Sequence, residues 1–475
     1  MRRYTVSLLL LVVLIGLWEL ATPLLAAPDE PQHLVKAAAV ARGQWIGRGE
    51  QVGPITRVSL PGGFTEISAF PRCFAFKPRR SAACTPPVTA HGGPAVEVGT
   101  TAGRYPPAYY ALTGLPTLVV QGVASDRAAR VVSGLLCALL LAAAITWCAG
   151  DLAALAVLFA VTPMVLFLSA VVNPSGVEAA AAVASWAGLI RLVRDQGPVR
   201  RKRLLALTAV LSALVLARPI SPLWLLLIAG CVGVLAPRAR LVELARTRGV
   251  QVAAGVLIGV AACQTAWVVV AQSTRLFGKP VHITRTTALD RLLSPTHIEH
   301  LGSQMIGRFG WLDTAAPLVT IWAWVVLGAV LLAIGLATGR RRARVAVLLA
   351  LALTVVVPAL VEASSFPRIG YWWQGRYSLP LAVGVPLLAL AGRRPPRRLL
   401  QVFVALLAAG VAVGQEAAFA NTLARYTVGA GHGLGLGAVH WQPPLPPLVL
   451  VVGFGLAVLA WAAWSSYLAL RPTTA

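Results

Sequence analysis

The chain has 475 residues, of which 57% are apolar and only 12% are charged. Soluble globular proteins carry about 25% charged residues, so the composition excludes that class. A transmembrane helix needs about 20 predominantly apolar residues. The apolar content therefore predicts an all-α polytopic membrane protein that forms a single integral membrane domain over residues 1–475.

The net charge of +25 would suggest a nucleic-acid partner for a soluble protein, but its distribution favours another interpretation. Most of the excess lies in short arginine-rich stretches between apolar runs, at residues 191–203, 237–249, 339–344 and 392–398. Short basic loops beside transmembrane helices mark the cytoplasmic side. We therefore expect both termini in the cytoplasm and no nucleic-acid partner. The arginine-rich and alanine-rich composition indicates the cell membrane of a bacterium with a GC-rich genome.

Thirteen apolar runs follow one another, at residues 5–27, 108–124, 131–150, 152–172, 176–192, 204–218, 220–236, 250–271, 316–338, 345–361, 378–391, 399–420 and 447–470. The first run contains Glu19 and lacks a convincing cleavage site, so we interpret it as a retained span. If residues 108–124 form the second span, the basic loop at 191–203 requires residues 131–172 to cross an odd number of times. Three short crossings, or one crossing with a re-entrant piece, satisfy this requirement and leave about thirteen or fourteen spans.

This topology places residues 28–107, 272–315, 363–377 and 421–446 on the outer face. All seven histidines of the chain fall in these loops, which locates the polar chemistry outside the cell. The first loop, residues 28–107, is long enough for a small folded layer against the membrane. Residues 272–315 form the second large loop. Cys73 and Cys84 lie in the first loop, where an oxidising compartment favours a disulfide over two free thiols.

Asp29, Glu30 and His33 form the first candidate site, immediately after the first span. Pro31 favours the first turn of a helix, which we expect to end at Gly43 and to lie along the membrane surface. Two carboxylates and an imidazole at its start can act as catalytic groups on a substrate proton, or the acids can bind a divalent metal, Mg²⁺ or Mn²⁺. Helix capping by the acids together with interfacial anchoring is the alternative.

Further candidates, for substrate binding, lie at the mouths of other spans. They are Arg104, Tyr105, Arg218, Asp313, Gln374, Arg376 and Tyr377. Guanidinium groups match phosphate oxygens, and an ionisable group near a membrane core is a functional candidate by default. Anchoring at the membrane interface is the alternative for the aromatic and basic members of this set.

Five sequence blocks together resemble an uncharacterised bacterial membrane family, domain of unknown function 2142. They are PDEPQH at 28–33, RYPPAYY at 104–110, TPMVLFLSAVVNPSG at 162–176, GRFGWLDT at 307–314 and QGRYSLP at 374–380. The family usually has Asn-Pro-Asp in the third block, where this chain has Ser175 in place of the acid. Either the role of that acid is missing in this chain or Glu178 takes it.

The layout of that family is similar to the C-fold glycosyltransferases, which use a polyprenyl-phosphate-linked sugar on the outer face. This resemblance implies that Asp29 or Glu30 contacts or deprotonates the acceptor, and that Arg218 or Arg376 binds the lipid phosphate. It also implies membrane lipid, a polyprenyl-phosphate-linked sugar and a cell-envelope glycan acceptor as partners. A transporter or flippase of a lipid-linked glycan and a non-catalytic partner in envelope assembly are the alternatives.

Overall fold

The computed structural model describes residues 2–49, 54–68, 73–85, 92–275, 281, 283–392, 397–432 and 439–471. Eight helices among these residues are long and apolar enough to cross a membrane: α1 (Arg2–Ala21), α6 (Gly122–Cys148), α9 (Pro174–Arg194), α13 (Arg248–Val270), α16 (Leu318–Thr338), α17 (Arg341–Ile369), α20 (Arg397–Thr427) and α21 (Pro447–Leu470). The chain is therefore an all-α polytopic membrane protein, as its composition predicts.

Four further passages between the two ends of the bundle are short or interrupted. They are α10 (Arg201–Ala217), α11 (Ser221–Leu235), the broken passage of α7 (Ala153–Ala160) with α8 (Pro163–Ser169), and that of α18 (Gly375–Ala382) with α19 (Gly384–Leu390). Every residue of α7 and α8 is buried, which is where a bilayer tolerates irregular backbone. The described residues thus pass from end to end twelve times, and the expectation of thirteen or fourteen spans is wrong.

The remaining elements connect these passages. They are the helices α2 (Glu30–Ala41), α3 (Phe64–Ser68), α4 (Ala108–Thr113), α5 (Pro116–Val119), α12 (Arg238–Arg246), α14 (Arg285–Leu292) and α15 (Pro295–Gly307), the 3-10 turn η1 (Ala82–Cys84), and the strands β1 (Arg48–Gly49), β2 (Thr56–Pro61), β3 (Ala95–Thr100), β4 (Arg308–Phe309) and β5 (Thr314–Ala315).

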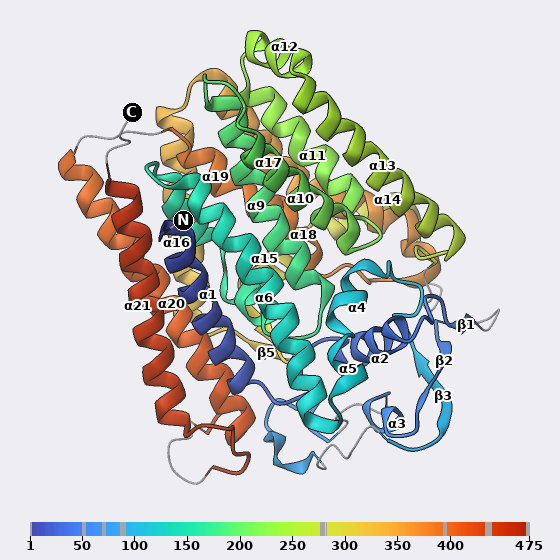
Figure 1. Cartoon of the computed structure of the whole chain (residues 1–475). Coiled ribbons are helices and arrows are strands. Elements are labelled where there is room, and N and C mark those ends of the chain that lie inside the picture. The colour runs from blue at the N-terminus through green and yellow to red at the C-terminus, as the bar shows by residue number, and fades with distance from the viewer. Residues whose placement is uncertain are drawn as a thin grey trace.

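The apolar run at 108–124 is the predicted span that does not cross. It contains the short helices α4 and α5, which stay beside α2 (Figure 1). Gly114 permits this close packing, because a Cβ atom there would lie 2.1 Å from the carbonyl oxygen of Ala37. With no crossing at this point, residues 131–172 cross twice, once in α6 and once in α7 with α8, and no re-entrant piece is needed.

The two ends of the bundle differ in charge. Figure 1 shows α1 and α21 running in opposite directions, so both termini lie at one end. Because each passage reverses the direction of the chain, the connections that carry residues 191–203, 237–249 and 339–344 lie at this same end. We call it the arginine-rich end. The other end, which carries the described residues of 28–107 and 271–317, is the opposite end.

The described histidines all lie at the opposite end. They are His33, His297, His300, His432 and His440, whereas His91 and His282 fall outside the described residues. The sequence-based grouping of the described histidines on one face is therefore confirmed, although the number of spans used to derive it was wrong.

The described residues between 28 and 107 form a layer over the opposite end. β1, β2 and β3 make an antiparallel sheet in that order, and α2 lies against it. α2 does not lie along the membrane surface as we expected, because ten of its 12 residues are buried. The ammonium group of Lys36 donates a hydrogen bond to the carbonyl oxygen of Gly103 at 2.7 Å and so fastens the helix to the far end of the layer.

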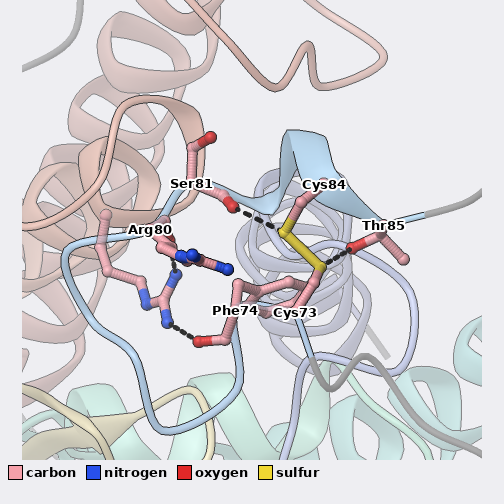
Figure 2. Close-up of a disulfide and its surroundings, with 7 residues drawn as sticks. Cys73, Phe74, Arg80, Ser81, Cys84 and Thr85 are labelled. Atoms are coloured by element: carbon pink, nitrogen blue, oxygen red, sulfur yellow. Dashed lines mark hydrogen bonds between the residues drawn. A yellow bond between two sulfur atoms is a disulfide. The ribbon is translucent and has the colours of Figure 1, made fainter.

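Cys73 and Cys84 form the expected disulfide, with their Cα atoms 6.0 Å apart (Figure 2). The loop between them is fastened to α20 by Arg425, whose guanidinium donates to the carbonyl oxygens of Phe74 and Arg80, both at 2.9 Å. The covalent link and the buried arginine therefore hold this part of the layer against the helix bundle.

Reduction of the disulfide should loosen this loop without unfolding the bundle. A cross-link that closes a loop of about a dozen residues stabilises the closed form by roughly 3 kcal/mol. Arg79 and Arg80 lie within the loop, so trypsin should cleave after them at least about tenfold faster once the disulfide is reduced. The Cys73→Ser, Cys84→Ser double variant should be cleaved equally fast with and without reductant. Cleavage of the native chain that does not respond to reductant would contradict the prediction.

Candidate functional site

Two buried guanidinium groups meet at the opposite end of the bundle. Arg218 joins α10 to α11, and Arg376 lies in the first turn of α18; they are 7% and 3% exposed. Both lie within cation–π distance of the Tyr377 ring, 4.1 Å from the centroid for Arg218 and 5.2 Å for Arg376. The structure therefore brings together three residues that the sequence singles out.

Each of these arginines has one carboxylate partner. Oδ2 of Asp29 accepts a hydrogen bond from Nη2 of Arg376 at 2.5 Å. Oε2 of Glu178 accepts from Nη1 of Arg218 at 3.2 Å, and its Oε1 accepts from the Ser221 hydroxyl at 2.6 Å. Glu178 is fully buried, whereas the Asp29 side chain is 46% exposed. Asp29 is thus the acid of this cluster that a ligand from outside can reach.

The backbone of Asp29 adopts a left-handed conformation, with φ of 60°. Asp29 occupies the N-cap position of α2, yet its side chain makes no capping hydrogen bond. A residue other than glycine held in this region costs about 1–3 kcal/mol, and such strain concentrates at functional sites. The carboxylate is therefore directed at Arg376 rather than at the helix end, which argues against the capping alternative.

His33 and two tyrosines enclose the cluster on the side of α2. The ring of His33 packs against Tyr105 and Tyr110, with centroids 5.6 Å and 5.9 Å away, and its Nδ1 lies 2.8 Å from the Tyr110 hydroxyl. Burial lowers the pKa of His33 to about 3, against the opposing effect of Asp29 and with a further lowering by Arg376. The imidazole is therefore neutral near pH 7 and serves as a hydrogen-bonding group.

The charges around Asp29 favour its ionised form. Partial desolvation raises the pKa of the Asp29 carboxyl, but the guanidinium groups of Arg376 and, more weakly, Arg218 outweigh that effect and lower the pKa below its usual range. At neutral pH the ionised Asp29 carboxylate therefore faces the guanidinium group of Arg376.

Several polar atoms of this cluster have no hydrogen-bond partner within the described part of the chain. They are Nε of Arg218, Nε and Nη1 of Arg376, and Oε1 of Gln374. A buried donor without a partner costs about 1–3 kcal/mol, so unpartnered donors on adjacent arginines indicate a place for an anion. Guanidinium groups match the oxygens of carboxylates and phosphates in particular.

Glu30 does not share the environment of Asp29. Its carboxylate forms a two-pronged ion pair with Arg130, with Nε to Oε1 and Nη2 to Oε2 both 2.7 Å. Arg130 also donates to the carbonyl oxygens of Thr22 and Pro23, both at 2.8 Å. Both groups are buried, so Glu30 is occupied in holding α2 to α1 and α6 rather than turned toward a ligand.

The two acids therefore do not fit a shared metal ion. Both oxygens of Glu30 are engaged by Arg130, and Asp29 is paired with Arg376. Over the described ranges of the chain, no group of three or more His, Cys, Asp or Glu side chains is arranged to hold a metal. The expected Mg²⁺ or Mn²⁺ site at Asp29 and Glu30 is not supported by this arrangement.

Two other predicted substrate-binding residues lie apart from the arginine cluster. Asp313 pairs with the buried Arg425 at 3.0 Å, in the hairpin of β4 and β5. Arg104 donates to the carbonyl oxygen of Ala271 at 3.3 Å and approaches Gly49 of the sheet. Both residues connect segments of the opposite end, and neither contacts Arg218 or Arg376 in the interactions found.

The sequence interpretation missed the role of Arg130 and gave too little weight to Glu178 and Tyr110. Arg130 stands at the start of an apolar run, where a lone arginine is a signal for a buried partner. Glu178 follows Asn173, whose side chain caps α9 and also donates to the carbonyl oxygen of Pro28 at 2.9 Å. This contact places the start of α9 beside the segment that carries Asp29.

Comparison with known proteins gives one match. A family model described as predicted membrane protein (DUF2142) matches residues 11–385 of the chain. The matched region includes Asp29, Arg218 and Arg376. No curated protein and no solved structure matches the chain.

Neutralising the two neighbouring acids should have unequal consequences for stability. Glu30→Gln leaves Arg130 as an uncompensated buried cation and should lower the free energy of unfolding by about 3–5 kcal/mol. Asp29→Asn also removes the carboxylate that pairs with buried Arg376, but water reaches the half-exposed Asp29 side chain, so the loss should be smaller, about 1–2 kcal/mol. Denaturant unfolding of both variants in the same detergent measures the difference. Equal losses for the two variants would show that Glu30 has no special structural role.

His33 should make stability fall in acid. Its pKa is about 3 in the folded chain against 6.5 for an ordinary histidine, so only the unfolded chain takes up a proton between these values. Stability is then fully present above pH 6.5 and declines below it, by about 2 kcal/mol at pH 5. His33→Gln removes this proton uptake, so its unfolding free energy should decline less than that of the native chain between pH 7 and pH 5. Parallel declines would contradict the assignment.

Proposed function

The chain belongs to the DUF2142 family of predicted membrane proteins, and from the site described above we propose that it is a membrane glycosyltransferase. It transfers a sugar from a polyprenyl-phosphate-linked donor to a cell-envelope acceptor. In this proposal the arginine-rich end faces the cytoplasm of a bacterial cell, since short basic loops mark that side. The cluster of Asp29, Arg218 and Arg376 then lies at the outer face.

One observation carries the proposal: a candidate phosphate site and an apolar cavity share helix α18. Arg376 supplies unpartnered N–H groups at the start of the helix. Leu379 and Val383 lie three and seven residues further on, on the same side of a helix, and line a cavity of about 330 Å³ whose walls are almost wholly apolar. A ligand with a phosphate head and a hydrocarbon tail matches this combination.

The geometry suits sugar transfer with displacement of a phosphate. An acceptor hydroxyl oxygen forms a bond to the anomeric carbon while the bond from that carbon to the lipid phosphate oxygen breaks. The proton of the hydroxyl passes to Asp29, and the charge that develops on the leaving phosphate is stabilised by Arg218 and Arg376. Asp29 suits the role of base because it is ionised at neutral pH and half-exposed.

The chain has Ser175 where the family pattern usually has an aspartate, and this difference is compatible with the proposed chemistry. Ser175 is buried in the first turn of α9, where the acid of the family pattern would stand. Glu178, one turn further along the same helix, supplies a carboxylate to Arg218. A carboxylate from α9 therefore still pairs with an arginine of the cluster.

A flippase for a lipid-linked glycan is the second candidate. The two broken passages, α7 with α8 and α18 with α19, favour it because discontinuous helices are frequent at transport sites. The charged cluster argues against it, since it lies at one end of the bundle rather than at its middle. Purified chain in vesicles separates the two, because a flippase moves intact lipid-linked glycan across the bilayer without transferring sugar.

Asp29→Asn and Arg376→Gln should each lower sugar transfer at least about 100-fold, because they remove the base and the phosphate ligand. The measurement is incorporation of label from a panel of polyprenyl-phosphate sugars into envelope glycan fragments by the purified full-length chain. Arg127→Gln is the matched control. Arg127 is a partly exposed arginine paired with Glu19 outside the cluster, so its loss should leave transfer within about twofold of the native rate.

Unchanged transfer by Asp29→Asn would contradict the assignment of the base. Folding of each variant is checked by its elution as a single species and by its unfolding midpoint. Movement of intact donor lipid without transfer, in the native chain, would replace the glycosyltransferase proposal with the flippase.

A further inference from the structure

A second polar cavity, of about 660 Å³, opens at the same end of the bundle. It is wide open to solvent and lies between α14, α15 and the segment that follows α17. Its lining includes Asp290 and Arg291 from α14, His297 and His300 from α15, and Tyr371. None of these residues belongs to the arginine cluster.

The chemistry of this lining narrows the class of ligand. Asp290 and Arg291 have opposite charges, so they offer no net charge to attract a strong anion or cation. The lining also includes the hydroxyl groups of Thr287, Ser294 and Thr296. Tyr371 is 57% exposed, so its ring presents apolar surface to the cavity. Balanced charge, many hydroxyl-bonding groups and one aromatic face together suit a neutral ligand that has both hydroxyl groups and a carbon face.

A buried polar pair stands behind the wall of the cavity. Oε2 of Glu362 and Nε2 of His297 lie 3.9 Å apart, and neither has a hydrogen-bond partner within the residues described. Both line a small cavity of about 30 Å³, which has room for one water molecule or one hydroxyl group. The other oxygen of Glu362 is fixed by the backbone N–H groups of Trp372 and Trp373, at 2.7 Å and 2.9 Å.

His297 connects the two cavities, because it lines both. Its ring stacks on that of Tyr371, with centroids 5.4 Å apart and an interplanar angle of 29°. A hydroxyl group or a water between Glu362 and His297 would therefore fix the imidazole, and with it the aromatic wall that a ligand meets.

We propose that the cavity lined by Asp290, His297 and Tyr371 is a second binding site, for a neutral saccharide unit. The carbon face of the sugar lies on the Tyr371 ring, and its hydroxyl groups bond to Asp290, Arg291 and the imidazoles. This site is independent of the proposed transfer reaction and would also serve a chain that binds glycans without reacting with them.

The test is saturation-transfer NMR with the full-length chain in lipid nanodiscs and a panel of hexose and pentose methyl glycosides. At least one glycoside should receive saturation that empty nanodiscs do not give. Tyr371→Ala should weaken its binding about tenfold, whereas Tyr371→Phe, which keeps the ring, should bind as the native chain does. Asp290→Asn should also weaken binding, and Glu299→Gln, an exposed acid of α15 outside the lining, should not.

Absence of saturation transfer to every glycoside of the panel would overturn the proposal, and so would equal binding by Tyr371→Ala and the native chain. Asp29→Asn separates this site from the proposed reaction, because it should leave glycoside binding unchanged. Loss of sugar transfer with intact glycoside binding in that variant supports both proposals. Intact binding in a native chain that transfers no sugar rejects the transferase alone.

Discussion

A guanidinium group buried among apolar helices must find hydrogen-bond acceptors, because removal of an ion from water without a partner costs several kcal/mol. This constraint organises the opposite end of the bundle. Arg130, Arg218, Arg376 and Arg425 are all nearly inaccessible, and each pairs with a carboxylate from a distant part of the chain. The layer over the helices is therefore fastened at defined points rather than by apolar packing alone.

The four arginines differ in how many of their N–H groups have hydrogen-bond partners. This difference separates the arginines that hold the fold together from those of the candidate site. Arg130 and Arg425 use Nε and both terminal nitrogens in hydrogen bonds to carboxylates, a hydroxyl and backbone carbonyls. Arg218 and Arg376 keep buried N–H groups without partners in the described chain. The saturated guanidinium groups hold the fold together, whereas the two adjacent arginines with unpartnered donors are the candidates for binding an anion.

Much of this could be predicted from residue types, and the rest could not, for identifiable reasons. Composition predicts the membrane class, and the oxidising outer face predicts the pairing of Cys73 with Cys84. Asp29 and Glu30 are neighbours with the same chemistry, so no pattern distinguishes them. The distinction comes from Arg130, 100 residues later, which takes Glu30 and leaves Asp29 to Arg376.

The predicted number of spans was wrong for a different reason. Hydropathy counts apolar residues, but the run at 108–124 folds into the two short helices α4 and α5 beside α2, and several of its apolar side chains, such as Leu115 and Val119, stay exposed. In contrast, the predicted run at 152–172 does cross, although its helix is broken between α7 and α8, because the surrounding helices cover both pieces completely. Tertiary contacts, which no local window contains, decide both cases.

The segment that leads into α18 depends on α15 as well as on its own sequence. The backbone N–H of Gly375 donates to Oε1 of Gln304 at 2.6 Å, and a Cβ atom at Gly375 would lie 2.3 Å from the carbonyl oxygen of Leu301. Only glycine allows α18 to begin this close to α15. Glu362 fixes the two preceding tryptophan amides, so the position of Arg376 is set from both sides. Since α15 also carries His297, a displacement of this helix by a ligand would move the start of α18, and the arginine cluster and the second cavity therefore share one mechanical support.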